Sequence, residues 1–133
     1  MTKEDIPGLT DYILYRLEKS GEAYKDACLL AKNRSWNAAV NRLYYSCFYA
    51  VSALLLNESI KAQTHTGVKS EFAKYFVKEG IVSREAFRLY SDLMDWRQKG
   101  DYGDMFDFDE DTVMEILPAV EKFLQIIHNL IKV

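Results

Sequence analysis

The sequence predicts an all-α fold, an antiparallel up-down bundle of four main helices plus a short fifth helix. Apolar residues recur at spacings of three and four along the chain, without convincing period-two alternation. Glycine and proline are scarce, at six and two of 133 residues, and turn signals at 32–34, Gly67, Gly80 and 100–103 separate the helical stretches. The length fits a single domain, residues 1–133, that buries about two thirds of its unfolded surface.

The first two predicted helices cover about residues 10–32 and 36–58, and a loop is expected over 57–63. Ser20 and Gly21 are expected to loosen the middle of the first helix, and Ser35 is the expected N-cap of the second. The predicted inner face of the first helix consists of apolar residues at helical spacing: Ile13, Leu17, Tyr24, Ala27, Cys28 and Ala31.

Three more helices are predicted from capping residues: Thr64 or Thr66 for a short third helix, Ser83 for the fourth, and Asp109 or Asp111 for the last. Gly80 is expected to end the third helix in a left-handed conformation, and Pro118 to kink the last helix or mark a weak first turn. The predicted apolar faces are Val68, Phe72, Tyr75 and Phe76 in the third helix; Phe87, Tyr90 and Met94 beside Arg97, with Leu89, Leu93 and Trp96, in the fourth; and Val113, Leu117, Val120, Leu124, Ile127 and Ile131 in the last.

The second predicted helix is apolar on more than one face. One stripe has members at spacings of three and four: Trp36, Val40, Leu43, Cys47, Val51 and Leu54. A second stripe lies to one side of it: Arg42, Tyr45, Tyr49 and Leu56, with Ser52 and Ala53 small enough to let a neighbour approach. A helix of this kind must be covered from more than one side, so we expect a partner, a second subunit or a ligand on the second stripe.

The composition excludes several classes of protein. A hydrophobic fraction of 49% with 28% charged residues is typical of a globular chain and excludes disorder as the default. Tyrosine and serine interrupt the apolar stretch near 51–56, and the N-terminus lacks a basic and apolar leader, so we expect a cytoplasmic protein without a membrane span. Cys28 and Cys47 have no CxxC spacing and are expected to be small buried residues.

The charge balance limits how the chain can bind nucleic acid. A net charge of −3 is not typical of proteins that hold nucleic acid by bulk electrostatics. Any nucleic-acid contact is therefore expected to be local and to depend on a few arginines.

Arg97 and Asp101, near the end of the fourth predicted helix, form the first candidate site. They are four residues apart and share a face if the helix persists that far. The arginine precedes the aspartate, which is the less favourable order for an ion pair on a helix. The negative charge of Asp101 at a helix C-terminus is also unfavourable to the helix dipole, so the pair suggests a tertiary or functional role. The alternative, which these two residues alone favour, is a surface ion pair beside a glycine turn.

Arg42 with Tyr44, Tyr45 and Tyr49 forms the second candidate site. A guanidinium beside phenol rings can hold a phosphate while the rings stack on a base. The favoured alternative is that the tyrosines are core or dimer contacts and that Arg42 pairs with a carboxylate such as Asp101.

Two further groups carry weaker signals. His65 lies at a helix start, where backbone N–H groups favour anions, and Lys69 can add charge, although a structural role is the favoured interpretation of this histidine. His128 has no metal-ligand partner at helical spacing, so no metal site and no cofactor are expected. The acidic residues over 101–111 are best explained by helix capping and solvation: Asp101, Asp104, Asp107, Asp109, Glu110 and Asp111.

The order of several features resembles the HEPN domain family, helical bundles named for nucleotide binding in higher eukaryotes and prokaryotes. The resemblance covers about residues 17–130. It depends first on segments 22–31 and 37–42 and on the apolar and aromatic residues that follow them: Tyr44, Tyr45, Phe48, Leu54 and Leu55. It depends also on the His65-Thr66-Gly67-Val68 segment leading to Phe72, and on Arg97 with Asp101 and Tyr102. It implies a prokaryotic homodimer whose second helix and whose region after the fourth helix line a shared cleft. It also implies a minimal nucleotidyltransferase as the partner in a toxin–antitoxin-like pair.

Toxic members of this family are metal-independent ribonucleases that use an arginine, a polar residue and a histidine four to six residues beyond the arginine. Arg97 matches the arginine, but Tyr102 stands where the histidine is expected. A tyrosine hydroxyl with a pKa near 10 is a poor acid–base group for cleaving RNA. Tyr102 is alternatively an acceptor for a nucleotidyl group from the partner.

We therefore expect a noncatalytic, dimeric nucleotide- or RNA-binding module. Its expected ligand-binding residues are Arg42, Tyr45, Tyr49, His65, Lys69 and Arg97, with Asp101 orienting an arginine and Tyr102 stacking or donating a hydrogen bond. Arg42 and Arg97 are expected to converge across a twofold axis. Two alternatives remain: a ribonuclease toxin built on Arg97, Asp101 and Tyr102, and a purely structural interaction dimer without a ligand.

Overall fold

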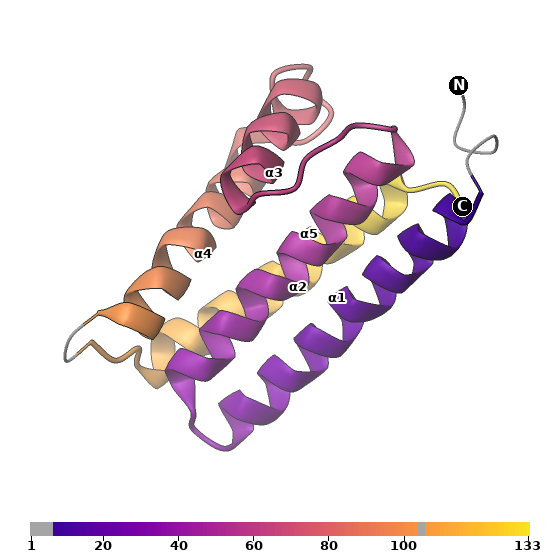
Figure 1. The fold of residues 1–133 in the computed structure, drawn as a ribbon. Coiled ribbons are helices and arrows are strands. Elements are labelled where there is room, and N and C mark those ends of the chain that lie inside the picture. Colours follow the sequence, from indigo (N-terminus) through magenta and orange to yellow (C-terminus); the bar gives the residue numbers. More distant parts are fainter. Residues whose placement is uncertain (1–6, 104–105) are drawn as a thin grey trace.

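The computed structural model describes residues 7–103 and 106–133 and is all-helical over these residues. The helices are α1 Leu9–Lys32, α2 Trp36–Asn57, α3 His65–Phe72, α4 Arg84–Tyr102 and α5 Glu110–Leu130, and a π-helical turn, η2 Ala73–Val77, extends α3. The four long helices lie side by side, and short α3 lies at one end of the bundle (Figure 1). The predicted bundle of four main helices and one short helix is confirmed.

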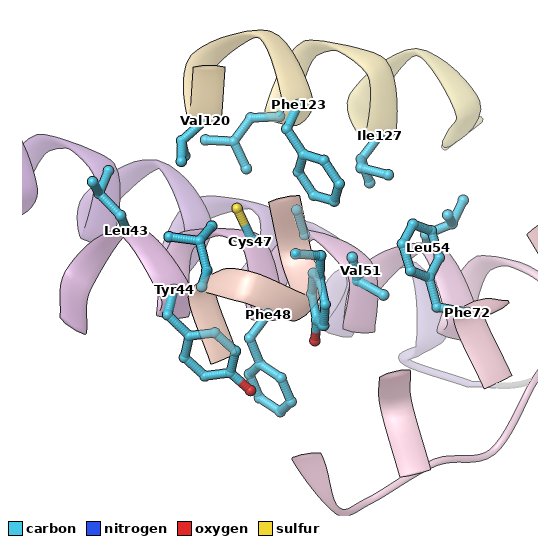
Figure 2. Close-up of a cluster of buried hydrophobic side chains, with 14 of the residues drawn as sticks. Leu43, Tyr44, Cys47, Phe48, Val51, Leu54, Phe72, Val120, Phe123 and Ile127 are labelled. Atoms are coloured by element: carbon cyan, nitrogen blue, oxygen red, sulfur yellow. The ribbon is translucent and has the colours of Figure 1, made fainter. Parts of the chain in front are cut away.

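Helix α2 is the centre of the bundle and contacts each of the other four α-helices. Its first predicted stripe is the core, because Val40, Leu43, Cys47, Val51 and Leu54 are completely buried, while Trp36 at the helix start is half-buried. Figure 2 shows three side chains of α5 pointing toward this stripe: Val120, Phe123 and Ile127. The second stripe is half-buried at Arg42, Tyr45, Tyr49 and Leu56.

Local sequence signals position the helix starts as predicted. Thr64, Ser83 and Asp109 each accept a hydrogen bond from a backbone N–H in the first turn of the helix that follows. Ser35 occupies the N-cap position of α2 without such a bond, and its hydroxyl instead accepts a hydrogen bond from the Asn33 amide. Gly80 is left-handed at φ 76°, in the turn that follows η2.

Three local predictions, for Cys28, Tyr75 and Ser20, were wrong. Cys28 and Tyr75 are exposed rather than buried. Ser20 does not loosen α1, because its buried hydroxyl donates a 2.7 Å hydrogen bond to the Ser46 carbonyl oxygen of α2 and α1 stays continuous. Of the two alternatives predicted for Pro118, the structure excludes the weak first turn, since the residue lies well inside α5, and the kink stays a prediction.

Asn37 fixes the segment that returns from α4 to α5. Its side-chain amide donates hydrogen bonds to the carbonyl oxygens of Phe106 at 2.9 Å and Gly100 at 3.3 Å, and its oxygen accepts one from the Phe108 N–H at 2.8 Å. Phe108 is buried and packs in a small cluster with Val40 and Val113. The C-terminal end of α4 is therefore held against the start of α2. Among residues 7–103 and 106–133, no helix combines the length and apolar content needed to cross a membrane.

Candidate functional site

The candidate site lies where α2, the first residue of α3 and the last turns of α4 meet. We call it the Arg97 cluster and define it by seven side chains: Asn41, Arg42, Tyr44 and Tyr45 of α2, His65 of α3, and Arg97 and Asp101 of α4. Three segments far apart in the sequence supply these side chains. The packing of α4 and α3 on α2 brings them together.

The Arg97 guanidinium lies over two tyrosine rings. Its central carbon is 5.0 Å from the ring centre of Tyr44 and 5.7 Å from that of Tyr45, both cation–π distances. The side chain is only 15% exposed, and its closest carboxylate contact is an Asp101 oxygen at 4.0 Å, which is too long for a hydrogen bond. Its buried Nε has no hydrogen-bond partner among the described residues. The guanidinium is thus enclosed, but it forms no hydrogen bond with a described residue.

Asp101 and Arg42 are connected through Asn41 rather than directly. The Asn41 amide donates a 2.9 Å hydrogen bond to Asp101, and its oxygen accepts two from Arg42, at 3.0 Å from Nε and 2.9 Å from Nη2. The direct pairing of Arg42 with Asp101 that the sequence suggested was wrong. The predicted sharing of a face by Arg97 and Asp101 is confirmed, because α4 persists to Tyr102.

His65 enters the cluster from the start of α3. Its Nδ1 lies 2.6 Å from the hydroxyl oxygen of buried Tyr44, and its ring stacks on Phe48 with the ring centres 4.4 Å apart. In Figure 2, Tyr44 and Phe48 point to the side of α2 opposite Val120 of α5. Thr64, one residue earlier, caps α3 by accepting a hydrogen bond from the Gly67 N–H, and this fixes the backbone that carries His65.

The electrostatics of the cluster keep both members of the His65–Tyr44 pair neutral near pH 7. Burial lowers the pKa of the His65 imidazole, and the neighbouring Arg97 charge lowers it further. Burial raises the pKa of the Tyr44 hydroxyl to about 12, although the Arg97 charge opposes that shift. Arg97 is therefore the positive charge at the centre of a neutral aromatic enclosure.

Both arginines lie close to one tyrosine ring within a single chain. The Arg42 guanidinium carbon is 4.9 Å from the ring centre of Tyr45, the same ring that Arg97 approaches at 5.7 Å. The convergence of Arg42 and Arg97 across a twofold axis stays a prediction. Two guanidinium groups, an aromatic ring and a neutral imidazole in one place can hold phosphate oxygens and stack on a base.

Other predicted site residues lie outside this arrangement. The ring centre of Tyr49 lies 6.0 Å from that of Tyr45 and 5.9 Å from that of Phe48, so Tyr49 borders the cluster. Lys69 is half-buried on α3 but forms no ion pair with any described carboxylate. Tyr102 is 77% exposed and makes no ring contact or hydrogen bond with a described residue. His128 is exposed on α5, and no cluster of three or more metal-binding side chains occurs over 7–103 and 106–133.

The acidic segment has structural roles where it is described. Asp109 caps α5 through the Thr112 N–H, Glu110 pairs with Arg34 at 2.9 Å, and Asp107 lies 3.4 Å from the Asn37 amide. Asp104 lies outside the described residues. The capping interpretation is therefore confirmed for Asp109.

Sequence reasoning missed the role of Asn41 as the bridge between Arg42 and Asp101. It also missed Phe48 as the ring that supports His65. The available signal was spacing: Asn41, Tyr44, Tyr45 and Phe48 recur at three and four along α2, which places them on one side of the helix.

Comparison with known proteins gives a consistent family. The sequence model of the HEPN domain matches residues 13–130. The UPF0332 protein of Thermotoga maritima is 40% identical over 120 residues, which cover 90% of this chain and 91% of that protein. A Methanocaldococcus jannaschii protein named "Putative toxin" is 33% identical over 112 residues, covering 84% of this chain and 74% of that protein. A UPF0332 protein of Archaeoglobus fulgidus is 25% identical over 115 residues, which are 86% of this chain and 91% of that protein.

Proposed function

The chain belongs to the HEPN domain family, and we propose that it is a nucleotide- or RNA-binding module that holds phosphate at Arg97. The observation that carries the proposal is the state of this guanidinium. It is enclosed by the rings of Tyr44 and Tyr45, only 15% exposed, and without a hydrogen bond to any described residue. In this proposal the whole chain, residues 1–133, acts as one HEPN-like bundle domain.

An enclosed guanidinium that forms no hydrogen bond with the described residues favours an anionic ligand. The group carries five N–H donors in a planar fork, which matches two oxygens of a phosphate. Burying a charge without such partners is costly, so a bound phosphate offsets a cost that the unbound protein carries. The half-buried ring of Tyr45 and the second guanidinium, of Arg42, lie next to this position and suit the base and the neighbouring phosphate.

The direct test is the affinity for a short single-stranded RNA, measured by fluorescence anisotropy. Arg97→Ala is expected to weaken binding by roughly tenfold or more, because a hydrogen bond to a charged group contributes about 1.5–3 kcal/mol. Arg97→Lys keeps the positive charge but loses the planar fork of N–H donors. Its affinity for the RNA is expected to lie between those of the wild type and Arg97→Ala. Arg34→Ala is the matched control, because it removes the same group from a surface ion pair with Glu110. Equal losses of RNA affinity in Arg34→Ala and Arg97→Ala would contradict the proposal.

A ribonuclease is the second candidate, and the His65–Tyr44 pair is the observation that favours it. Cleavage of RNA needs a group that accepts the 2′-hydroxyl proton, and a neutral imidazole beside a guanidinium suits this task better than exposed Tyr102. The expected activity persists in a chelator and is lost in Arg97→Ala. If His65→Asn loses ribonuclease activity while Tyr102→Phe keeps it, the proton transfer is assigned to His65. If Tyr102→Phe loses the activity while His65→Asn keeps it, the transfer is assigned to the set of Arg97, Asp101 and Tyr102. Undamaged RNA after incubation with the wild-type protein rejects the candidate.

We also propose that the chain forms a homodimer and acts with a minimal nucleotidyltransferase in a toxin–antitoxin-like pair. Membership of the HEPN family and the relative named as a toxin support this pairing. The half-buried residues Arg42, Tyr45, Tyr49 and Leu56 supply a surface on α2 for a second subunit. Light scattering is expected to give twice the chain mass, and co-expression of the nucleotidyltransferase is expected to relieve any growth arrest. A monomeric mass at micromolar concentration would contradict the dimer.

A further inference from the structure

A pocket lies away from the Arg97 cluster, beside the segment that connects α2 to α3. It is a pocket of about 720 Å³ between the start of α1, the C-terminal half of α2 and the segment that leads to α3. None of the seven side chains of the Arg97 cluster lines it. Its volume is within the range of pockets that hold small organic ligands, about 300–1,000 Å³.

The wall of this pocket is mainly apolar. The side chains that form it come from three elements and the connecting segment: Tyr12, Phe48, Leu55, Leu56, Ile60 and Val68. Tyr12 is 51% exposed, whereas Leu55 and Val68 are almost fully buried, so the pocket deepens from an aromatic rim to an aliphatic floor. Such a wall favours an apolar molecular body over a polar one.

One polar group in the wall has no partner. Ser52 is 7% exposed, and its Oγ makes no hydrogen bond with any described residue. The Ser52 Oγ is itself closed off from solvent, so the argument for a ligand depends on the apolar wall and the charges beside it and not on this hydroxyl.

Two cations also line the pocket. Arg16 forms a 3.3 Å hydrogen bond with the Tyr12 hydroxyl and lies 5.2 Å from the centre of the same ring. Lys61 is exposed in the segment that connects α2 to α3. Neither forms an ion pair with a carboxylate of the described residues, in contrast to Arg34 and Lys19. Within the described ranges, the charges of Arg16 and Lys61 thus have no carboxylate partner.

We propose that this pocket binds an amphipathic organic anion, a small molecule with an apolar body and one acidic group. The body would fill the space beside Leu55, Leu56 and Val68, and the acidic group would lie between Arg16 and Lys61. A nucleic-acid strand suits the pocket less well, because its polar base edges would lie against the apolar side chains of Leu55, Leu56 and Val68. This site is separate from the phosphate site of the proposed function.

The pocket adjoins the Arg97 cluster through one side chain. Phe48 lines the pocket and stacks on His65 at 4.4 Å between ring centres. A bound aromatic ligand is therefore expected to shift the NMR signals of the His65 ring as well as those of Ser52.

A matched pair of probes tests the proposal. Anilinonaphthalene sulfonate is an aromatic anion whose fluorescence rises in an apolar site, and N-phenylnaphthylamine is the same ring system without the charge. Both are titrated into the wild-type protein and into an Arg16→Gln/Lys61→Gln variant. The variant is expected to bind the sulfonate roughly three- to tenfold more weakly, because it loses two ionic contacts at the protein surface. Its affinity for the uncharged probe is expected to be unchanged.

The control variant is Lys25→Gln/Lys122→Gln, which removes two exposed lysines elsewhere and changes the net charge equally. It is expected to bind both probes like the wild type. Leu56→Trp narrows the pocket and is expected to weaken both probes, with circular dichroism confirming that the variant is folded. Arg97→Ala is expected to leave sulfonate binding unchanged, so failure of the RNA proposal and failure of this one are distinguishable.

Three results would overturn the proposal: no saturable binding of either probe, equal losses in the two double variants, or an equal loss of the charged and uncharged probes in Arg16→Gln/Lys61→Gln.

Discussion

At the scale of single residues, Arg34 and Arg97 show how surroundings separate a structural arginine from one available to a ligand. The Arg34 side chain is 69% exposed and bonded to Glu110 at 2.9 Å, a surface ion pair. Arg97 is 15% exposed, and its closest carboxylate oxygen is 4.0 Å away. The sequence cannot distinguish these two cases, because Glu110 and Asp101 are both plausible partners by composition. Only the packing of α4 on α2 shows which guanidinium forms no hydrogen bond within 7–103 and 106–133.

His65 gives a prediction about stability and pH. Its folded-state pKa lies below the ordinary value of 6.5, so the unfolded chain binds the proton more readily than the folded one. The stabilising contribution is therefore fully present above pH 6.5 and is lost as pH falls through that value toward the lower folded pKa. We expect the midpoint temperature of thermal unfolding to decrease as the pH is lowered from 7.5 to 5.5.

The matched variants for this prediction are His65→Gln and His128→Gln. The pKa of His128 is also lowered by burial, so each substitution is expected to reduce the slope of stability against pH in this range. Arg97→Ala should also reduce it, since the Arg97 charge contributes to the shift at His65. A slope that is identical in the wild type and in His65→Gln would show that His65 is not the group responsible.

At the scale of helices, most of the fold could be predicted because its signals are local. Apolar spacing gave the five helices, and Thr64, Ser83 and Asp109 gave three of their starts. Errors occurred where a neighbouring helix decides the outcome. Cys28 is exposed next to buried Ala27, because the stripe of α1 that meets α2 is narrow and made of alanines at Ala23, Ala27 and Ala31.

The start of α3 gives a prediction about cooperation between two residues. Thr64 Oγ1 accepts a 2.9 Å hydrogen bond from the Gly67 N–H, and a Cβ added at Gly67 would lie 2.8 Å from that oxygen. In a Thr64→Ala background the clash is absent, so Gly67→Ala is expected to stabilise the protein by up to about 1 kcal/mol, the usual gain in helix propensity. With Thr64 present, displacement of the cap, worth about 1 kcal/mol, is expected to cancel that gain.

A double-mutant cycle in urea measures this coupling. Ser83→Ala, which removes the cap of α4, is the control background and should leave the effect of Gly67→Ala unchanged. Equal effects of Gly67→Ala with Thr64 and with Ala at position 64 would refute the steric argument.

At the scale of the whole molecule, the net charge of −3 and the local Arg97 cluster together set how binding should respond to salt. The family and the helical class followed from the sequence, whereas the convergence of Asn41, His65 and Arg97 did not, because it depends on how three helices pack. Bulk attraction to nucleic acid is absent, so binding should depend on the two arginines at Tyr45.

Two phosphate contacts predict a weak salt dependence for single-stranded RNA. Log affinity should fall with log salt concentration with a slope of about −1.4, that is, about −0.7 for each neutralised phosphate. Arg97→Ala should bring the slope to about −0.7 by the same relation, and Arg34→Ala should not change it. A slope several times steeper in the wild type would indicate an extended basic surface that the described residues do not provide.

The most direct test of the central claim observes the guanidinium itself. In NMR spectra of arginine side chains, addition of a short single-stranded RNA is expected to shift the Arg97 N–H signals saturably, because they gain phosphate acceptors, while the Arg34 signals stay in place. An Arg97 signal that does not move while RNA is demonstrably bound would contradict the account.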